Sequence, residues 1–221
     1  MAAKLRITIV GAGNLGTAMA VSLRRAGYAI ESVIARARGA SLRKAEKLGR
    51  EVGALASVGP PAEVRAGVIW FCVPDGEIAR VARALADKVK WKGKTALHSS
   101  GALASDELDA VRRRGAAVAA VHPLMTFVHG SRPSLAGVPF AVEGDAAAVR
   151  VARRIVNDLA GYSCTIRKKD KAAYHAWGAF ASPLFDALLA TAKKEGRGRL
   201  KIFFGAAPGV GAALQPMLDL G

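Results

Sequence analysis

The sequence is poor in cysteine, and this excludes a disulfide-stabilised fold. Two cysteines, Cys72 and Cys164, occur in 221 residues, too few for the framework that holds small secreted proteins together. Cys72 lies inside the apolar run 68–73, so we expect an inert, buried thiol. No group of cysteines and histidines has the spacing of metal ligands, so we expect no metal site.

Long hydrophobic runs are also missing. No apolar stretch approaches the roughly 18 to 20 residues that cross a bilayer, and Met1 leads into a strand-like segment without the features of a signal peptide. Hydrophobic residues nevertheless make up 52% of the chain, which excludes global disorder. We therefore expect a soluble, cytoplasmic protein of one or two domains that does not bind membranes.

Acidic residues are scarce, with 17 Asp and Glu against 33 Lys and Arg, and the formal net charge is +16. This excess has two explanations, a surface for nucleic acid or solvated faces with a few cations reserved for an anionic cofactor. The basic pairs and triplets are scattered along the chain and lack interleaved aromatic residues that would stack on bases. We favour the second explanation and expect no nucleic-acid partner.

Short β-like runs alternate with helical patterns over the first half of the chain, which is typical of a parallel sheet covered by helices. The fold class is therefore α/β, with a doubly wound, mainly parallel sheet of the Rossmann type. We expect strands at 5–10, 29–35, 53–57, 68–73, 94–97, 116–121, 138–142 and 162–166. We expect helices at 17–26, from a cap at Ser41 to about 49, from 77 to about 89, at 102–114 and at 145–159, with a one-turn helix begun by Pro61.

A glycine motif, Gly-Ala-Gly-Asn-Leu-Gly at 11–16, follows the first expected strand and opens the first expected helix. In the G-x-G-x-x-G pattern, Gly11 permits the tight turn, Gly13 lets a pyrophosphate approach the backbone, and Gly16 lets helix and strand pack closely. The amides of the helix start, including those of Asn14 and Leu15, then face the phosphates. The motif predicts a dinucleotide site.

The end of the second strand indicates which dinucleotide binds. NAD sites usually carry an acidic residue there, but this chain has Arg36, 20 positions after Gly16, and no carboxylate before Ser41. Arg36 and Arg38 match a 2′-phosphate, and the Ser41 hydroxyl adds a donor. The alternative is a pair of surface arginines. We expect NADP as the cofactor.

Three further strand ends should open at the same edge of the sheet. They carry Val73-Pro74-Asp75, His98-Ser99-Ser100-Gly101 and His122-Pro123. Val73 and Pro74 would border the cofactor, His122 could move a proton, and Ser99 and Ser100 could hold a substrate carboxylate or carbonyl. The alternatives are a histidine that caps its strand and serines that cap a helix.

The pattern changes at 169, where one long, Ala-rich helix begins and runs to about 192, with Pro183 expected to bend it. Lys171, Tyr174 and His175 are spaced i, i+3 and i+4 and share one face, which could supply a proton donor and a carboxylate clamp. The alternative is a solvated, basic helix start. We place a domain boundary near 165 and expect an irregular tail at 196–221.

These segments together resemble an uncharacterised bacterial Rossmann-like family with its own C-terminal domain of unknown function. The resemblance covers residues 4–195 and rests on 11–16, 73–75, 98–101, 122–127 and 171–182. That family is related to deazaflavin-dependent NADP oxidoreductases, pyrroline-5-carboxylate reductase and β-hydroxyacid dehydrogenases. The resemblance implies an NADP-binding domain at 1–165 and a helical substrate and dimerisation domain at 166–221, and hence a homodimer through the C-terminal helix.

Two looser resemblances concern the chemistry. His122-Pro123 is similar to the His-Pro pair of prephenate dehydrogenases, whose histidine contacts the substrate hydroxyl. Lys171 lies where β-hydroxyacid dehydrogenases carry their catalytic lysine, although Tyr174 replaces the Asn or Asp of those enzymes. Members of such a family continue for several more helices, so the C-terminal domain looks truncated here.

Two functions follow from these observations. The first is an NADP-dependent oxidoreductase that acts on a small carbonyl, imine or hydroxyacid, with His122, Lys171, His175 and Ser99 as catalytic candidates. The second is a non-catalytic NADP-binding or sensing protein, or an enzyme inactivated by a shortened C-terminus. NADPH would bind in both cases, but only the first would oxidise it.

Overall fold

The structure, a computed structural model, describes residues 4–179. The chain divides into two units, Met1–His175 and Ala176–Gly221, and the contacts discussed below lie within the first. The later part of the long helix with Pro183 and the tail at 196–221 lie outside the described residues.

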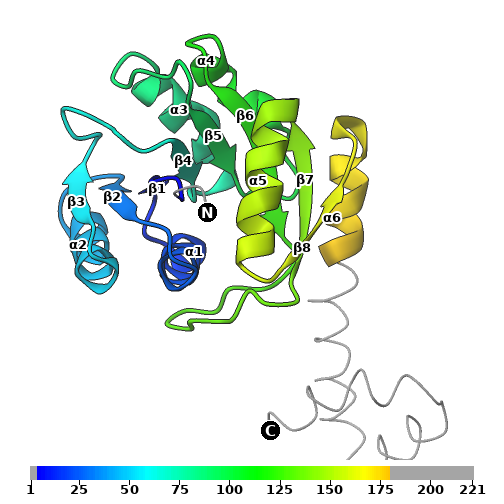
Figure 1. Cartoon of the computed structure of the whole chain (residues 1–221), viewed down its shortest axis with the longest axis horizontal. Helices are drawn as coiled ribbons and strands as arrows, with labels where there is room; N and C mark the ends of the chain where they lie inside the picture. The colour runs from blue at the N-terminus through cyan, green and yellow to red at the C-terminus, as the bar shows by residue number, and fades with distance from the viewer. Residues whose placement is uncertain (1–3, 180–221) are drawn as a thin grey trace, which may run out of the picture. The chain divides into compact units, whose positions relative to one another are not determined.

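One eight-stranded sheet forms the centre of the fold, in the order β3-β2-β1-β4-β5-β6-β7-β8 (Figure 1). The first six strands are parallel, β7 runs antiparallel to β6, and β8 is parallel to β7. The strands are β1 (Ile7–Val10), β2 (Ile30–Ala35), β3 (Leu55–Val58), β4 (Val68–Phe71), β5 (Thr95–His98), β6 (Ala117–Pro123), β7 (Pro139–Gly144) and β8 (Tyr162–Thr165). All eight expected strands are present, and the expected Rossmann-type sheet is confirmed.

Helices cover both faces of the sheet, which makes the fold doubly wound (Figure 1). On one face, α1 (Asn14–Arg25), α2 (Ala40–Val52) and α5 (Ala146–Asp158) pack their apolar sides into one core. On the other face, α3 (Ile78–Ala86) and α4 (Asp109–Arg112) pack into a second core. Trp70 and Phe71 of the central strand β4 enter opposite cores, as a strand buried on both faces requires.

Two expected helix starts are wrong. Ser41 does not cap α2, because the helix begins at Ala40 after Gly39, whose φ of +74° favours glycine. The Ser41 hydroxyl instead accepts a hydrogen bond from the Arg36 amide at 3.2 Å, which closes the turn after β2. Pro61 begins no helix. Lys94 Nζ instead donates hydrogen bonds to the carbonyls of Val64 and Ala66, so the segment after Pro61 is irregular.

Two other helices are shorter than expected. The one predicted at 102–114 is a 3₁₀ turn at Ser105–Leu108 followed by the four residues of α4. It starts late because the buried Glu143 carboxylate accepts hydrogen bonds from the Ser105 amide and hydroxyl. The helix expected to reach 89 ends at Ala86, where the Trp91 indole donates to the Leu85 carbonyl at 3.2 Å.

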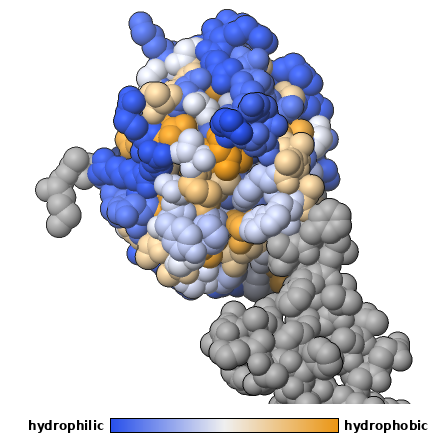
Figure 2. All heavy atoms as spheres, turned by 90° about the vertical axis from the view of Figure 1, so that its right-hand side faces the viewer, coloured by the Kyte–Doolittle hydropathy of each residue, from blue (hydrophilic) through white to orange (hydrophobic). Residues whose placement is uncertain are grey.

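The surface of the described residues is mixed in character. Figure 2 shows hydrophilic residues over the upper and outer parts of one face, with hydrophobic residues in smaller groups toward its centre. Between residues 4 and 179, no helix is both long enough and apolar enough to span a bilayer.

Candidate functional site

The loop after β1 has the geometry that a phosphate-binding glycine motif needs. Gly11 has a φ of +104°, and a Cβ there would lie 2.6 Å from the Cys72 carbonyl oxygen. A Cβ on Gly16 would lie 2.0 Å from the Gly11 carbonyl oxygen, so the helix start can approach the loop only without a side chain. A Cβ on Gly13 would meet no atom within 4 Å. The first two glycines named are needed by the fold, whereas Gly13 leaves open space.

The start of α1 offers backbone donors to a ligand. Gly13 is the N-cap and has no side chain to bind the first-turn amides, and the first turn holds no acidic residue. These amides and the helix dipole therefore favour an anion. The Asn14 side chain donates to the Phe127 carbonyl at 3.1 Å, and Leu15 packs against the core.

A cavity of about 400 Å³ opens beside this loop, and we call it the adenosine cavity after the group that we propose below to bind there. Its walls come from the glycine loop, the start of α2, the end of β4 and α3. The lining residues are Gly11, Ala12, Gly13, Arg36, Ala40, Ser41, Lys44, Cys72, Val73, Pro74, Glu77 and Val81.

Most of the expected cofactor residues meet at this cavity, including Arg36, Ser41, Val73 and Pro74. Arg38 is exposed and is not among the lining residues. Lys44 is an addition that the sequence analysis missed, although its position three residues after Ser41 places it on the same side of α2. Arg36 also adds to the positive field that lowers the pKa of Glu77, behind the larger effect of the Arg80 hydrogen bond.

A second group of polar residues lies at the carboxyl ends of β5 and β6. The structure brings His122 and Gly101 together with Lys171, Tyr174 and His175 from the start of α6 (Lys171–Ala179). His122 Nδ1 lies 3.0 Å from the Tyr174 hydroxyl, and the His122 and His175 rings are 6.1 Å apart between centroids. We call these five residues the histidine cluster.

Gly101 is where the two imidazoles converge. A Cβ at this position would lie 2.6 Å from His175 Nδ1 and 2.9 Å from His122 Nε2. Only glycine therefore leaves both rings in place, and the Gly101 backbone lies directly beneath the two ring nitrogens.

Ser100 links this cluster to the end of β4. Lys171 is buried, and its Nζ donates to the Ser100 carbonyl at 3.1 Å. The Ser100 hydroxyl donates to Asp75 at 2.7 Å and accepts from the Leu103 amide at 2.9 Å. It caps no helix, because the next helical turn begins at Ser105 with Ala104 as its N-cap. The Ser99 hydroxyl instead accepts from the Trp70 indole at 2.8 Å, inside the core.

Burial sets the protonation states of the cluster. It lowers the pKa of His122 to about 4, helped by Coulombic repulsion from Lys171 and the His175 ring and opposed by Asp75. Burial also lowers the pKa of Lys171, against the attraction of Glu143 and Asp75, and raises the pKa of Tyr174 to about 12. At neutral pH, His122 is therefore a neutral imidazole beside a neutral phenol.

His98 supports the site and does not face it. Its Nε2 donates to the Ala104 carbonyl at 3.0 Å, and its Nδ1 accepts from the Ser100 amide at 3.2 Å. Burial lowers its pKa to about 4, so the ring is neutral and its two hydrogen bonds fix one tautomer. The ring thereby holds the Ser99–Ser100 turn.

Cys72 is a buried thiol, as expected, and burial raises its pKa to about 12. Within residues 4–179, no three His, Cys, Asp or Glu side chains are arranged to hold a metal ion. The sequence analysis missed a further buried residue, Glu143. A single acidic residue within the apolar strand β7 indicates a carboxylate that is hydrogen-bonded inside the fold.

A mainly parallel sheet with a glycine loop at the carboxyl end of its first strand defines a Rossmann-type α/β protein. The chain belongs to the Rossmann-like domain family, whose model matches residues 1–123. Residues 138–199 match a domain of unknown function, DUF2520. These two matches confirm the resemblance drawn from the sequence motifs. A search of the curated proteins finds no significant match.

Solved structures with the same fold include several NAD(P)-linked proteins. A Bacteroides fragilis protein named as an NADP oxidoreductase is 19% identical, with a TM-score of 0.73 over 98% of this chain and 78% of its own. Pyrroline-5-carboxylate reductase from Coxiella burnetii is 17% identical, with a TM-score of 0.68 over 99% and 78%.

Reductive aminase from Aspergillus terreus, in complex with NADPH and ethyl-5-oxohexanoate, is 20% identical. Its TM-score is 0.62 over 98% of this chain and 74% of its own. At these identities the likeness establishes the fold.

Proposed function

We propose that this protein is an NADP-dependent oxidoreductase that transfers a hydride to or from a small carbonyl, imine or hydroxyacid. The observation that carries the proposal is the placement of two sites at one edge of the sheet. The glycine loop and the adenosine cavity form one, and the histidine cluster forms the other. Ligands of open α/β sheets bind at this edge.

Three cationic or hydroxyl groups in the adenosine cavity favour NADP over NAD. Arg36, Ser41 and Lys44 lie at the end of β2 and the start of α2, where the ribose 2′ position of a dinucleotide is read. An arginine fork binds a phosphate through two charge-assisted hydrogen bonds. Val73 and Pro74 supply an apolar wall.

The substrate end would use the histidine cluster. When bound, NADPH supplies a hydride to an electrophilic carbon. Neutral His122 can donate a hydrogen bond from Nε2 to a developing oxyanion while Nδ1 accepts one from the Tyr174 hydroxyl, and a proton that passes from Nε2 to the product is replaced at Nδ1 by the proton of Tyr174. Lys171, which has three N–H donors and gives one to Ser100, adds positive charge that suits a carbonyl or carboxylate oxygen.

The structural neighbours support the same substrate class. The Coxiella burnetii protein is a pyrroline-5-carboxylate reductase, and the Aspergillus terreus protein is a reductive aminase that was solved with NADPH and a keto ester. Ser99 remains a catalytic candidate through its hydroxyl proton and the second lone pair of its oxygen, since one lone pair accepts from Trp70. His175 is exposed and can reach a substrate above Gly101.

We also propose that the protein is a homodimer through the C-terminal helix. Trp177, on α6, is 60% exposed, which suits a contact with a second chain. Sedimentation at micromolar concentration should show a dimer, and a stable, monodisperse monomer would contradict the proposal.

Two measurements test the function. The first is the consumption of NADPH, followed at 340 nm, with a panel of ketones plus amines, cyclic imines and keto acids. Turnover with one member, lost in His122→Asn, would support the oxidoreductase. Tight NADPH binding without turnover across the panel would favour the non-catalytic NADP-binding protein.

The second measurement is the ratio of dissociation constants for NADH and NADPH. Arg36→Ala should reduce this ratio roughly 10- to 150-fold, because a hydrogen bond to a charged group contributes about 1.5–3 kcal/mol. Arg43→Ala is the matched control, since Arg43 lies on α2 and does not line the cavity. Arg38→Ala decides whether the second expected arginine takes part.

A further inference from the structure

The turn 99–101, which follows β5, forms one wall of the histidine cluster. A Cβ on Gly101 would lie 2.9 Å from His122 Nε2 and 2.6 Å from His175 Nδ1, so both rings contact the backbone of this turn. One residue earlier, the Ser100 carbonyl accepts a hydrogen bond from Lys171 Nζ at 3.1 Å. A shift of the turn would therefore change the space beneath both ring nitrogens and the acceptor of the buried ammonium.

Ser100 is the residue through which this turn is fixed, and all of its polar groups have partners. Its amide donates to His98 Nδ1 at 3.2 Å, and its hydroxyl accepts from the Leu103 amide at 2.9 Å. These two partners lie within three positions of Ser100, so they shape the turn without placing it. Asp75 and Lys171 are 25 and 71 positions away, and their hydrogen bonds place the turn relative to the rest of the fold.

Asp75 belongs to the cofactor side of the sheet edge. It follows Val73 and Pro74, which line the adenosine cavity, and it begins a short 3₁₀ turn. That turn leads into α3, whose first residue, Ile78, is fully buried in the second core. The Asp75 backbone is thus held between the cavity wall and the core, and its carboxylate is a fixed point for the turn 99–101.

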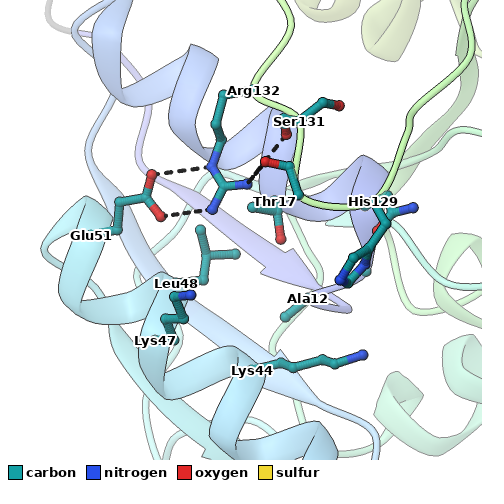
Figure 3. Close-up of a pocket in the computed structure, with 12 residues that line it drawn as sticks. Ala12, Thr17, Lys44, Lys47, Leu48, Glu51, His129, Ser131 and Arg132 are labelled. Atoms are coloured by element: carbon teal, nitrogen blue, oxygen red, sulfur yellow. Dashed lines mark hydrogen bonds and ion pairs between the residues drawn. The ribbon is translucent and has the colours of Figure 1, made fainter.

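The loop that follows His122 is held by contacts of its own. Figure 3 shows Arg132 of this loop beside Glu51 of α2, and both carboxylate oxygens of Glu51 accept from Arg132 at 3.2 Å. The Asn14 side chain, at the start of α1, donates to the Phe127 carbonyl in the same loop at 3.1 Å. Since these contacts tie the loop to two helices, we expect His122 to stay in place when the neighbouring turn moves.

The Asp75 carboxylate can act on the cluster through its hydrogen bond or through its charge. The hydrogen bond to Ser100 is direct, at 2.7 Å. The charge attracts the protons of Lys171 and His122 and works against the lowering of their pKa values. Asp75 is exposed, however, and water and salt screen an exposed charge. The geometry therefore favours the hydrogen bond.

We propose that Asp75 is a positioning residue of the proposed oxidoreductase. Its hydrogen bond to Ser100 holds the turn 99–101 so that Gly101 stays beneath the ring nitrogens of His122 and His175. The inference rests on the proposed function and connects its two sites, because the loop that carries Asp75 also walls the adenosine cavity.

Nuclear magnetic resonance of the imidazole nitrogens tests the position of the turn without a substrate. The chain has four histidines, so each ring can be assigned by a single substitution to Asn. At pH 7, Asp75→Ala should shift the ring-nitrogen signals of His122 and His175. Asp75→Asn should leave them close to those of the wild type, because its amide oxygen accepts the same hydrogen bond without the charge. Asp87→Ala is the matched control and should shift neither ring, since Asp87 is another exposed acid, at the end of α3, that pairs with Arg114.

Turnover gives the second readout, with the panel member that the wild type turns over fastest. Asp75→Ala should lower kcat about tenfold, because one hydrogen bond to a charged group is lost, and should leave the dissociation constant of NADPH unchanged. Asp75→Asn should restore most of kcat. Ser100→Ala removes the same hydrogen bond from the other side, so the double variant Asp75→Ala/Ser100→Ala should be no slower than Ser100→Ala alone.

Unchanged ring signals or an unchanged kcat in Asp75→Ala would overturn the inference. So would an Asp75→Asn protein that is impaired as much as Asp75→Ala, because the charge and not the position would then be responsible. A wild-type protein that binds NADPH but turns over no panel member would instead overturn the proposed function. The ring signals would still decide whether Asp75 positions the turn.

Discussion

Two glycines of the loop after β1 differ in what a methyl group would meet, so alanine at each should fail in a different way. At Gly16 the new Cβ would lie 2.0 Å from the Gly11 carbonyl oxygen, which is backbone and cannot rotate away. At Gly13 it would meet no protein atom within 4 Å, and the φ of −76° suits alanine. Gly16→Ala should therefore damage the fold, and Gly13→Ala should damage ligand binding alone.

The magnitudes follow from these contacts. Overpacking typically costs 1–3 kcal/mol, and a backbone clash at Gly16 falls at the upper end, about 3 kcal/mol or more. For a chain of this size, that lowers the melting temperature by roughly 6–12 °C. Alanine at Gly13 loses a favoured N-cap residue, at about 0.5–1 kcal/mol, but gains about 0.4–1 kcal/mol by restricting the unfolded chain. The net change in stability should be close to zero.

Thermal unfolding followed by circular dichroism, paired with NADPH titration by fluorescence, reads out both effects. Gly13→Ala should melt within about 2 °C of the wild type and bind NADPH at least tenfold more weakly, because its methyl group occupies the space into which a pyrophosphate must come. A Gly13→Ala protein that binds NADPH normally would refute this use of the loop. A Gly16→Ala protein that melts normally would refute the close packing of helix on strand.

Further predictions concern protonation and the histidine cluster. Burial lowers the pKa values of His98 and His122 to about 4, and both histidines regain the ordinary value of 6.5 on unfolding. Between these values the unfolded chain binds more protons than the folded one. The free energy of unfolding should therefore fall as the pH drops from about 6.5 to 4. Equilibrium denaturation across that range checks this, and His122→Asn should flatten the slope. A thiol reagent should modify Cys164 in the native protein and leave Cys72 untouched, because Cys72 is buried with a pKa of about 12; modification of both in folded protein would contradict the buried position. Tyr174→Phe should slow NADPH oxidation about tenfold through the loss of one hydrogen bond to His122, and an equal loss of NADPH affinity would place Tyr174 at the cofactor instead.

The sequence predicted the elements whose signals are local and repetitive. Alternating apolar strands and helices were enough for the sheet, because a strand such as β4 that is buried on both faces reads as a continuous apolar run. The glycine motif could be located because two of its glycines, Gly11 and Gly16, answer steric demands that only glycine meets. Gly11 and Gly16 now show those demands as distances to backbone atoms.

The errors lie where long-range side-chain contacts decide local structure. The start of the helix at Ser105 depends on Glu143, which is 38 positions away in the chain, and the open segment after Pro61 depends on Lys94. Ser99 and Ser100 are adjacent and alike in sequence, yet one faces Trp70 and the other Asp75. Such partners cannot be assigned from spacing alone.

Cofactor choice is the centre of this account, and paired titration of NADPH and NADH into the wild-type protein tests it most directly. Arg36, Ser41 and Lys44 around the adenosine cavity predict that NADPH binds more tightly than NADH, by roughly 10- to 150-fold. Equal affinities, or tighter binding of NADH, would contradict it.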